Sequence, residues 1–321
     1  MATYKEIFGT NIEVVSSDPA NPVEGQVWYN TTTEVVKGLG ATTAGAWATG
    51  GSINSARDTL AGSGVQTAAL IFGGQAPNSA LTESYNGTSW TEVNDLNTAR
   101  NGLAGCGTST SSLAYGGEPN TGATESFNGT NWTEVNDLAT ARRNISGAGV
   151  DNTSALAFGG YATAFTGATE SWNGTNWTEV NDLNTARGSS SGFGTSTAAI
   201  TAGGEVPPAT LTTATESWNG TNWTEVNDLN TARYQLAAAG ISTSGLVFGG
   251  LTPPVTGATE EWNGTNWTEG NDMSITRYAE AGVGVQTSAL AAAGSRSVPA
   301  ALVSEEWTGA GVPVVQTFTD S

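Results

Sequence analysis

The stretch WTEVNDLNTAR occurs three times without change in this chain, at residues 90–100, 177–187 and 223–233. Two near-copies accompany it, WTEVNDLATAR at 132–142 and WTEGNDMSITR at 267–277. The arginines that end these copies, together with Arg57, mark six units whose starts lie 42 to 46 residues apart. Repeats of this length are typical of propellers, solenoids and other arrays, so the order of short patterns inside one unit decides the fold.

Each unit reads as four short strands. A strand of small residues follows the arginine, such as LAGSGV at 60–65, and an apolar strand ending in a glycine pair comes next, such as ALIFGG at 69–74. The third and fourth strands flank an Asn-Gly turn, as in WNGTNW at 172–177. Asn and Gly tolerate positive φ, so this turn is a strong hairpin signal. No segment shows sustained helical periodicity, and the pattern therefore predicts an all-β fold.

The order of these patterns resembles the kelch repeat. It runs from Arg through an apolar strand ending in Gly-Gly to a Glu with an aromatic residue two positions later, then to Trp and a turn leading to the next Arg. The resemblance covers about residues 47–307, and it implies a six-bladed kelch-like β-propeller with four-stranded blades. We therefore expect an N-terminal attachment segment at 1–40 containing a β-hairpin, a propeller at 41–307, and a C-terminal tail or edge strand at 308–321.

The sixth unit lacks an obvious fourth strand that begins with tryptophan. Trp47 stands ten residues before Arg57, the same interval that separates Trp90 from Arg100. This spacing predicts that residues 46–51 supply the outer strand of the last blade, so that both ends of the repeat region close the ring. VPVVQTF at 312–318 is a competing candidate, since its proline would be tolerated on an exposed edge strand.

Two charged residue types recur once in every unit. Because each is needed identically in all units, we expect them to satisfy buried backbone groups or to pair within a blade. The alternative is a charged ring that binds a ligand. The residues are Arg57, Arg100, Arg142, Arg187, Arg233 and Arg277, with Glu83, Glu125, Glu170, Glu216, Glu260 and Glu305.

Five aspartates also recur, each in the Asn-Asp turn of a unit. Asx hydrogen bonding accounts for them, with calcium binding as the alternative. They are Asp95, Asp137, Asp182, Asp228 and Asp272.

The segment between the glycine pair and the glutamate differs in every unit, as in QAPNSALT at 75–82 and EVPPATLTTAT at 205–215. Such variation marks loops on one face of a repeat protein, often the binding face, although neutral drift would also produce it. In a four-stranded meander these loops lie on the same face as the loop that begins the next blade. The candidate ligand contacts are Gln75, Asn78, Glu118, Asn120, Tyr161, Phe165, Glu205 and Arg296.

Composition removes several kinds of function. The 321 residues include 10 Lys and Arg against 29 Asp and Glu, a net charge of −19, with no histidine and one cysteine. This charge opposes nucleic-acid binding, which depends on Lys and Arg, and it opposes anionic membrane surfaces. The lack of histidine excludes a Ser-His-Asp triad and histidine-bound metals. Cys106 alone cannot form an internal disulfide. We predict no cofactor and no metal site.

The N-terminal segment lies outside the repeat. NPVEGQVWYNTTTEVVKG at 21–38 alternates like a hairpin, and its Gly-x-x-Trp-Tyr-Asn pattern resembles the N-terminal segments of bacteriophage tail-fibre and related virion proteins. This resemblance implies attachment to a particle through residues 1–40, with Val27, Trp28 and Tyr29 as contact residues. The alternative is an extra hairpin packed on the propeller. We see neither a signal peptide nor a membrane span in the sequence.

These observations predict a non-enzymatic virion structural protein of a bacteriophage, in a tail fibre, another appendage or a capsid decoration. Its partners would be other virion proteins, through residues 1–40, and a host-surface glycan or protein, through the variable loops. It would be assembled in the host cytoplasm and lie on the virion exterior. An intracellular kelch-type adaptor is one alternative. A glycan-active enzyme is another, which we disfavour because no isolated carboxylate pair stands out.

Overall fold

The computed structural model describes residues 12–20, 25–41, 44–75, 77–295, 302–311 and 313–318, and every regular element among them is a β-strand. The chain divides into two compact units, Ala46–Trp307 and a smaller one made of Met1–Gly45 with Thr308–Ser321. In the described ranges, no helix is long and apolar enough to cross a membrane.

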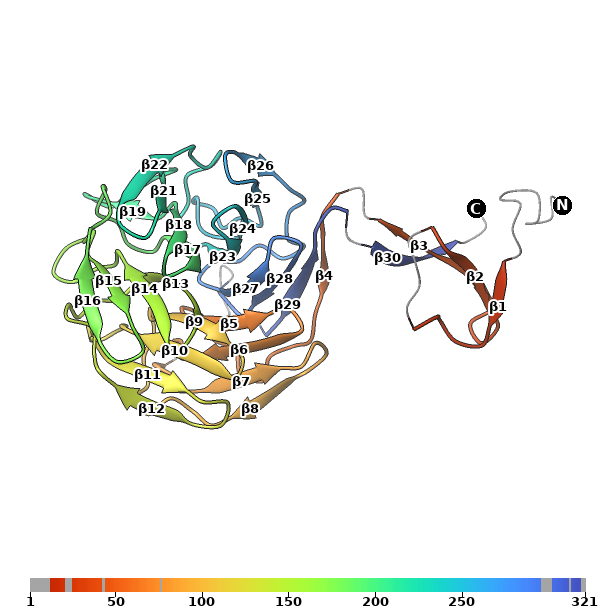
Figure 1. The fold of residues 1–321 in the computed structure, drawn as a ribbon, viewed down its shortest axis with the longest axis horizontal. Coiled ribbons are helices and arrows are strands. Elements are labelled where there is room, and N and C mark those ends of the chain that lie inside the picture. The colour runs from red at the N-terminus through yellow and green to blue at the C-terminus, as the bar shows by residue number, and fades with distance from the viewer. Residues whose placement is uncertain are drawn as a thin grey trace. The chain divides into compact units, whose positions relative to one another are not determined.

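The unit Ala46–Trp307 is a six-bladed β-propeller, with six four-stranded sheets among its described residues arranged around a centre (Figure 1). The first three blades are β5 (Ala61–Val65), β6 (Ala68–Phe72), β7 (Thr82–Tyr85) and β8 (Trp90–Val93); β9 (Ala104–Thr108), β10 (Ser111–Tyr115), β11 (Thr124–Phe127) and β12 (Trp132–Val135); and β13 (Ser146–Asp151), β14 (Ser154–Phe158), β15 (Thr169–Trp172) and β16 (Trp177–Val180).

The other three blades follow the same plan. They are β17 (Ser191–Thr195), β18 (Ala198–Ala202), β21 (Thr215–Trp218) and β22 (Trp223–Val226); β23 (Ala237–Ile241), β24 (Ser244–Phe248), β25 (Thr259–Trp262) and β26 (Trp267–Glu269); and β27 (Ala281–Val285), β28 (Ser288–Ala292), β29 (Ser304–Thr308) and β4 (Ala46–Thr49). The fourth blade also carries a short hairpin, β19 (Glu205–Val206) with β20 (Thr210–Leu211), in one loop.

The ring is closed by a strand that precedes the first blade in the sequence. The innermost strands pack side by side in chain order, and β27 packs against β5. The last blade has the order β27-β28-β29-β4, so the closing strand is β4. The indole N–H of Trp47 donates to Thr259 Oγ1 of the preceding blade at 3.0 Å, as Trp132 does to Thr82 Oγ1 at 3.1 Å. The prediction from the Trp47 spacing is confirmed, and closure by residues 312–318 is wrong.

The core lies between the blades. The second strand of each blade is buried on both faces, which is why it reads as a continuous apolar run such as ALIF. Aromatic rings join neighbouring blades, for example Phe72 and Trp132 with centroids 4.8 Å apart. At the end of this strand a Cβ on Gly73 (φ +70°) would lie 2.8 Å from the carbonyl oxygen of Arg100 in the next blade. The glycine pair therefore permits the blades to approach closely.

The smaller unit joins both ends of the chain in one sheet. Its strands are β1 (Glu13–Val15), β2 (Val27–Asn30), β3 (Val35–Ala41) and β30 (Pro313–Phe318), in that order. β2 and β3 form the predicted hairpin, and β30 runs antiparallel along β3. The predicted tail therefore supplies an edge strand to this sheet rather than to the propeller.

Trp28 belongs to the interior of this unit. Its side chain is 0% exposed, and its indole N–H donates to Asp18 Oδ1 at 3.1 Å. Asn30 and Lys37 also bind the Asp18 carboxylate, and hydrogen bonds from Lys37, Asn30 and Trp28 lower its pKa to about 2. Trp28 is thus buried within this unit, and its role as a particle contact stays a prediction. Val27 and Tyr29 on the same strand are half-buried and keep some exposed surface.

Candidate ligand-binding face

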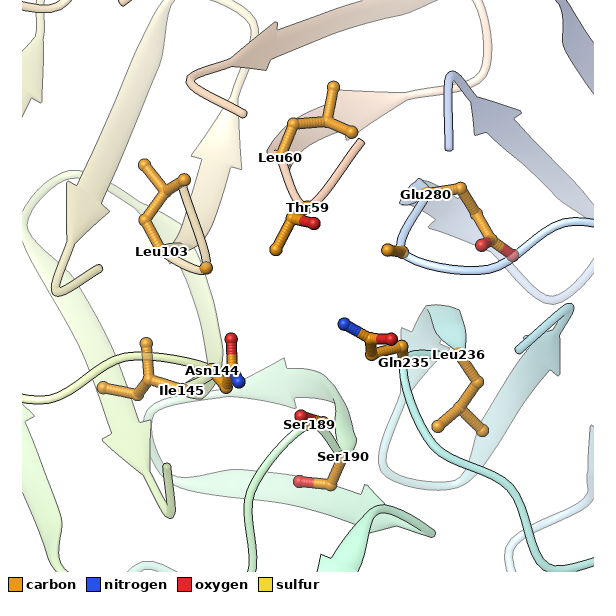
Figure 2. A pocket seen from close by; sticks show the side chains of 12 residues that line it. Thr59, Leu60, Leu103, Asn144, Ile145, Ser189, Ser190, Gln235, Leu236 and Glu280 are labelled. Carbon is orange, nitrogen blue, oxygen red and sulfur yellow. The ribbon is translucent and has the colours of Figure 1, made fainter. Parts of the chain in front are cut away.

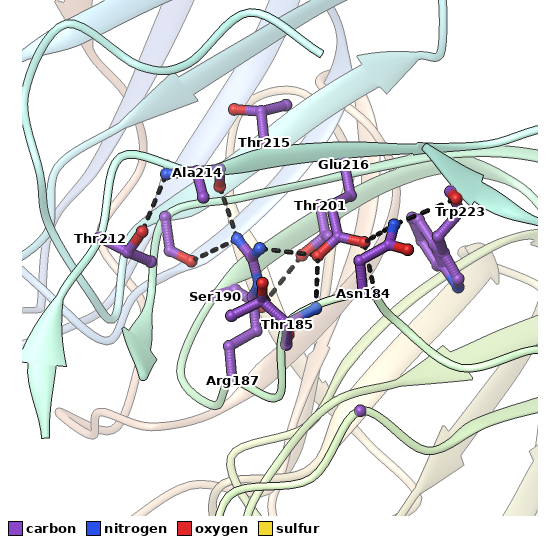
Figure 3. A network of polar contacts seen from close by, with 12 residues as sticks. Asn184, Thr185, Arg187, Ser190, Thr201, Thr212, Ala214, Thr215, Glu216 and Trp223 are labelled. Atoms are coloured by element: carbon purple, nitrogen blue, oxygen red, sulfur yellow. Dashed lines mark hydrogen bonds and ion pairs between the residues drawn. The ribbon is translucent and has the colours of Figure 1, made fainter. Parts of the chain in front are cut away.

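The repeated arginines and glutamates are buried inside the blades. In every blade the arginine forms an ion pair with the glutamate of the same blade, as predicted, and the side chains of both are no more than 2% exposed. Figure 3 shows the fourth blade, where Arg187 Nη2 lies 2.8 Å from Glu216 Oε1 and Arg187 Nη1 donates to the Ala214 carbonyl. Glu216 also accepts the backbone N–H of Asn184 at 2.8 Å. No ligand can reach these charges, so they do not form a binding ring.

The repeated aspartates and Asn-Gly turns are also structural. Asp95 Oδ1 accepts the backbone N–H of Thr82 at 3.0 Å, and the equivalent bond recurs in the next four blades. Asn86 Oδ1 accepts the N–H groups of Thr88 and Ser89 across the turn. Over the described ranges of the chain, no group of three or more His, Cys, Asp or Glu gathers to hold a metal.

The variable loops meet the blade-starting loops at one end of the propeller. In every blade the residue after the arginine pairs with the residue after the glycine pair through an antiparallel bridge (an alanine replaces the first glycine in the sixth blade). The pairs are Asp58 with Gln75, Asn101 with Glu118, Arg143 with Tyr161, Gly188 with Glu205, Tyr234 with Leu251, and Tyr278 with Ser295. This end, the loop face, therefore gathers the residues that differ most between repeats.

A closed circle of backbone hydrogen bonds forms the floor of the loop face. Its members stand two residues after each arginine, and each has a φ between +50° and +60°. The N–H of each donates to the carbonyl of the member in the preceding blade at 2.7 to 2.9 Å, and Thr59 completes the circle by donating to Ala279. The members are Thr59, Gly102, Asn144, Ser189, Gln235 and Ala279.

The centre of this circle is narrow. Figure 2 shows the side chains of Thr59, Asn144 and Gln235 around the axial pocket, with Leu103 and Leu236 pointing away from it. The pocket encloses about 100 Å³, which is room for a few water molecules, each needing about 30 Å³. The axial pocket is therefore too small for a ligand of ordinary size.

Several predicted contact residues on the second and third blades bind one another. Glu118 forms an ion pair with Arg143, and the Arg143 guanidinium lies 5.0 Å from the centre of the Tyr161 ring. Tyr161 packs edge-on against Phe165 at 5.5 Å. Asn120 Nδ2 donates to the Ala162 carbonyl. The structure thus brings these residues together as a self-satisfied cluster.

Among the remaining predicted contacts, Asn78 joins this cluster, because its Nδ2 donates to the Glu118 carbonyl at 3.5 Å. Asn78 Oδ1 accepts a hydrogen bond from Asn101 Nδ2 at 2.6 Å. Glu205 is half-buried beside Gly188, and burial raises its pKa. Gln75 is exposed at the rim of a second pocket. Arg296 lies outside the described residues.

This second pocket spans the first, fifth and sixth blades and has a volume of about 480 Å³. Burial raises the pKa of the half-buried Tyr234, and the nearby Glu205 and Tyr278 raise it further. We call this second pocket the tyrosine pocket. Its lining residues are Asp58, Thr59, Gln75, Tyr234, Gln235, Leu251 and Tyr278.

Sequence reasoning identified only Gln75 among the residues of the tyrosine pocket. A usable signal was present, because the position after the invariant arginine is Asp, Asn, Arg, Gly, Tyr and Tyr in the six repeats. The same kind of variation between repeats identified the loops that follow the glycine pairs as candidate contacts. Applied to the position after each arginine, it would also have identified Tyr234 and Tyr278.

Comparison with known proteins places the fold in the β-propeller class. No family model matches the chain, and neither does any curated protein sequence. Among solved structures, 454 chains match. One of them, described as "Structure of YjhT", has a TM-score of 0.65 at 13% identity and covers 83% of this chain and 99% of its own. This likeness is one of fold.

Proposed function

We propose that this protein is a non-enzymatic structural component of a bacteriophage virion, in a tail fibre, another appendage or a capsid decoration. The propeller is displayed on the particle exterior and touches the host surface through its loop face. The smaller unit, which contains the Gly-x-x-Trp-Tyr-Asn hairpin, attaches it to other virion proteins.

One observation carries the binding role. The residues that recur in every blade form buried ion pairs and stabilise turns, whereas the residues that differ between blades meet on the loop face. A scaffold of constant residues that presents variable ones is typical of recognition.

The chemistry of the loop face supports binding rather than catalysis. Glycoside hydrolysis uses a pair of carboxyl groups, and Asp58 is the one carboxylate among the residues that line the tyrosine pocket. On the second and third blades, Glu118 is engaged by Arg143. These groups suit hydrogen bonding to a ligand better than proton transfer.

The smaller unit supports the attachment role. It is a separate compact unit with its own buried tryptophan, and it holds both ends of the chain. Val27 and Tyr29 are the predicted contact residues that retain exposed surface there. Val14, Val315 and Phe318 are between 46% and 65% exposed, an apolar surface suited to a protein partner.

The test is incorporation into particles. Phage lacking the gene is complemented with the full chain or with residues 46–307, and purified particles are probed by immunoblot. We expect the full chain in the particles and residues 46–307 only in the lysate. Absence of the full chain from purified particles would contradict the proposed function, and equal incorporation of the two would contradict the attachment role.

A further inference from the structure

The tyrosine pocket presents polar side chains that are not hydrogen-bonded to any residue in the described ranges. In the part of the chain that the structure describes, the side chains of Gln75, Tyr234, Gln235 and Tyr278 form no hydrogen bond. The opposite part of the loop face differs, because Glu118, Arg143 and Tyr161 contact one another there. Small-molecule binding sites are typically concave and carry a few hydrogen-bonding groups that are available to a polar ligand.

The kinds of group in the pocket restrict the ligand. Tyrosine offers an apolar ring face and one hydroxyl, and each glutamine offers both donors and an acceptor. Leu251 adds an apolar contact. A saccharide ring has the matching surface, since its C–H groups form apolar patches and its hydroxyls both donate and accept.

Charge and size restrict it further. The protein carries a net charge of −19, and the Asp58 carboxylate lies in the pocket, so an anionic ligand would be repelled. A volume of about 480 Å³ lies within the range of small-molecule sites and suits one or two sugar rings.

We infer that the tyrosine pocket binds a neutral saccharide, with the rings of Tyr234 and Tyr278 against the sugar and with Gln75 and Gln235 bonded to its hydroxyls. That this saccharide is displayed on a host surface rests on the proposed function. The binding itself does not depend on it.

The test is saturation-transfer NMR and calorimetry with the purified full chain. The neutral probes are glucose, galactose, mannose, rhamnose and N-acetylglucosamine, each as the monosaccharide and as a disaccharide. Sialyllactose serves as the anionic probe and choline as the cationic one. We expect at least one neutral probe to bind, with Tyr234→Ala and Tyr278→Ala each weakening it by about tenfold or more.

Matched variants separate binding from folding. Thr133→Ala changes an exposed side chain on β12, away from the loop face, and should leave affinity unchanged. Gln75→Ala changes an exposed side chain and should weaken binding while the urea unfolding midpoint stays constant.

Three outcomes would overturn the inference: no neutral probe binds, binding survives both pocket tyrosine substitutions, or choline or sialyllactose binds through the pocket in place of the sugars. Presence in particles is measured independently, so failure of the virion role would leave tyrosine-dependent sugar binding intact.

Discussion

At the scale of single residues, the repeated ion pair explains why the arginine and glutamate never vary. Burial lowers the pKa of Arg187, and Glu216 offsets part of that effect. Removing one partner would leave a buried charge without compensation. This role could be predicted from the sequence, because a residue required identically in six blades cannot be specific to one ligand.

Replacing Arg187 with Ala should therefore lower the free energy of unfolding by about 3 to 5 kcal/mol, with loss of folded protein rather than a selective loss of binding. Urea denaturation followed by tryptophan fluorescence measures the change. Arg143→Ala is the control, because its ion pair with Glu118 is 36% and 38% exposed and should contribute about 1 kcal/mol or less. Equal effects of the two substitutions would refute the structural role.

Glu280 is an exception that the repeat did not reveal. Its position holds Leu60, Leu103, Ile145 and Leu236 in four other blades, where an apolar side chain packs between blades. Glu280 is 6% exposed, lies against Gly249, and has no hydrogen-bond partner for either oxygen in the described part of the chain. Burial raises its pKa to about 8, although Arg277 and Arg233 act in the opposite direction.

This carboxyl should make stability depend on pH. The folded protein keeps Glu280 protonated while the unfolded chain ionises it near pH 4.5, so its contribution to stability is complete below that pH and declines as pH rises to about 8. Glu280→Leu should raise the free energy of unfolding by about 4 kcal/mol more at pH 9 than at pH 5.

Urea titrations at both pH values measure this difference. Glu92→Gln, at an exposed position of β8, is the matched control and should follow the wild type. A Glu280→Leu advantage that does not change with pH would show that the carboxyl is not held protonated.

At the scale of elements, the strands inside the repeat and the hairpin of β2 and β3 could be predicted, but the pairing of β30 with β3 could not. The interval from Trp90 to Arg100 provided an internal standard that assigned β4 to the last blade. VPVVQTF could be named as a candidate edge strand, but nothing local identifies β3 as its partner. Pairing between strands far apart in sequence depends on tertiary packing.

Truncation distinguishes the two ends of the chain. Residues 46–307 keep all six described blades and should retain the urea midpoint of the full chain's propeller. Residues 52–307 lack β4 and the Trp47 ring that packs against Phe248 and Trp307, and their midpoint should fall by the equivalent of about 3 kcal/mol or more. Circular dichroism and fluorescence report both. If 52–307 is as stable as 46–307, β4 does not close the ring.

At the scale of the whole molecule, the repeat pattern predicted correctly that the variable loops meet at one end of the propeller. It did not predict the tyrosine pocket on that loop face. The tyrosine pocket arises because ring closure brings the first blade beside the sixth, so Asp58 and Gln75 approach Tyr234 and Tyr278 from more than 150 positions away in sequence. A linear pattern identifies which loops vary. It does not show which of their side chains remain without partners after folding.

The central claim is that the propeller is displayed on a virion with its loop face toward the host. Immunogold electron microscopy of intact purified particles, using serum raised against residues 52–307, tests it most directly. We predict label at a discrete tail or capsid position, and loss of that label with particles that lack the gene. Unlabelled particles, with the protein found only in the soluble lysate, would contradict the claim.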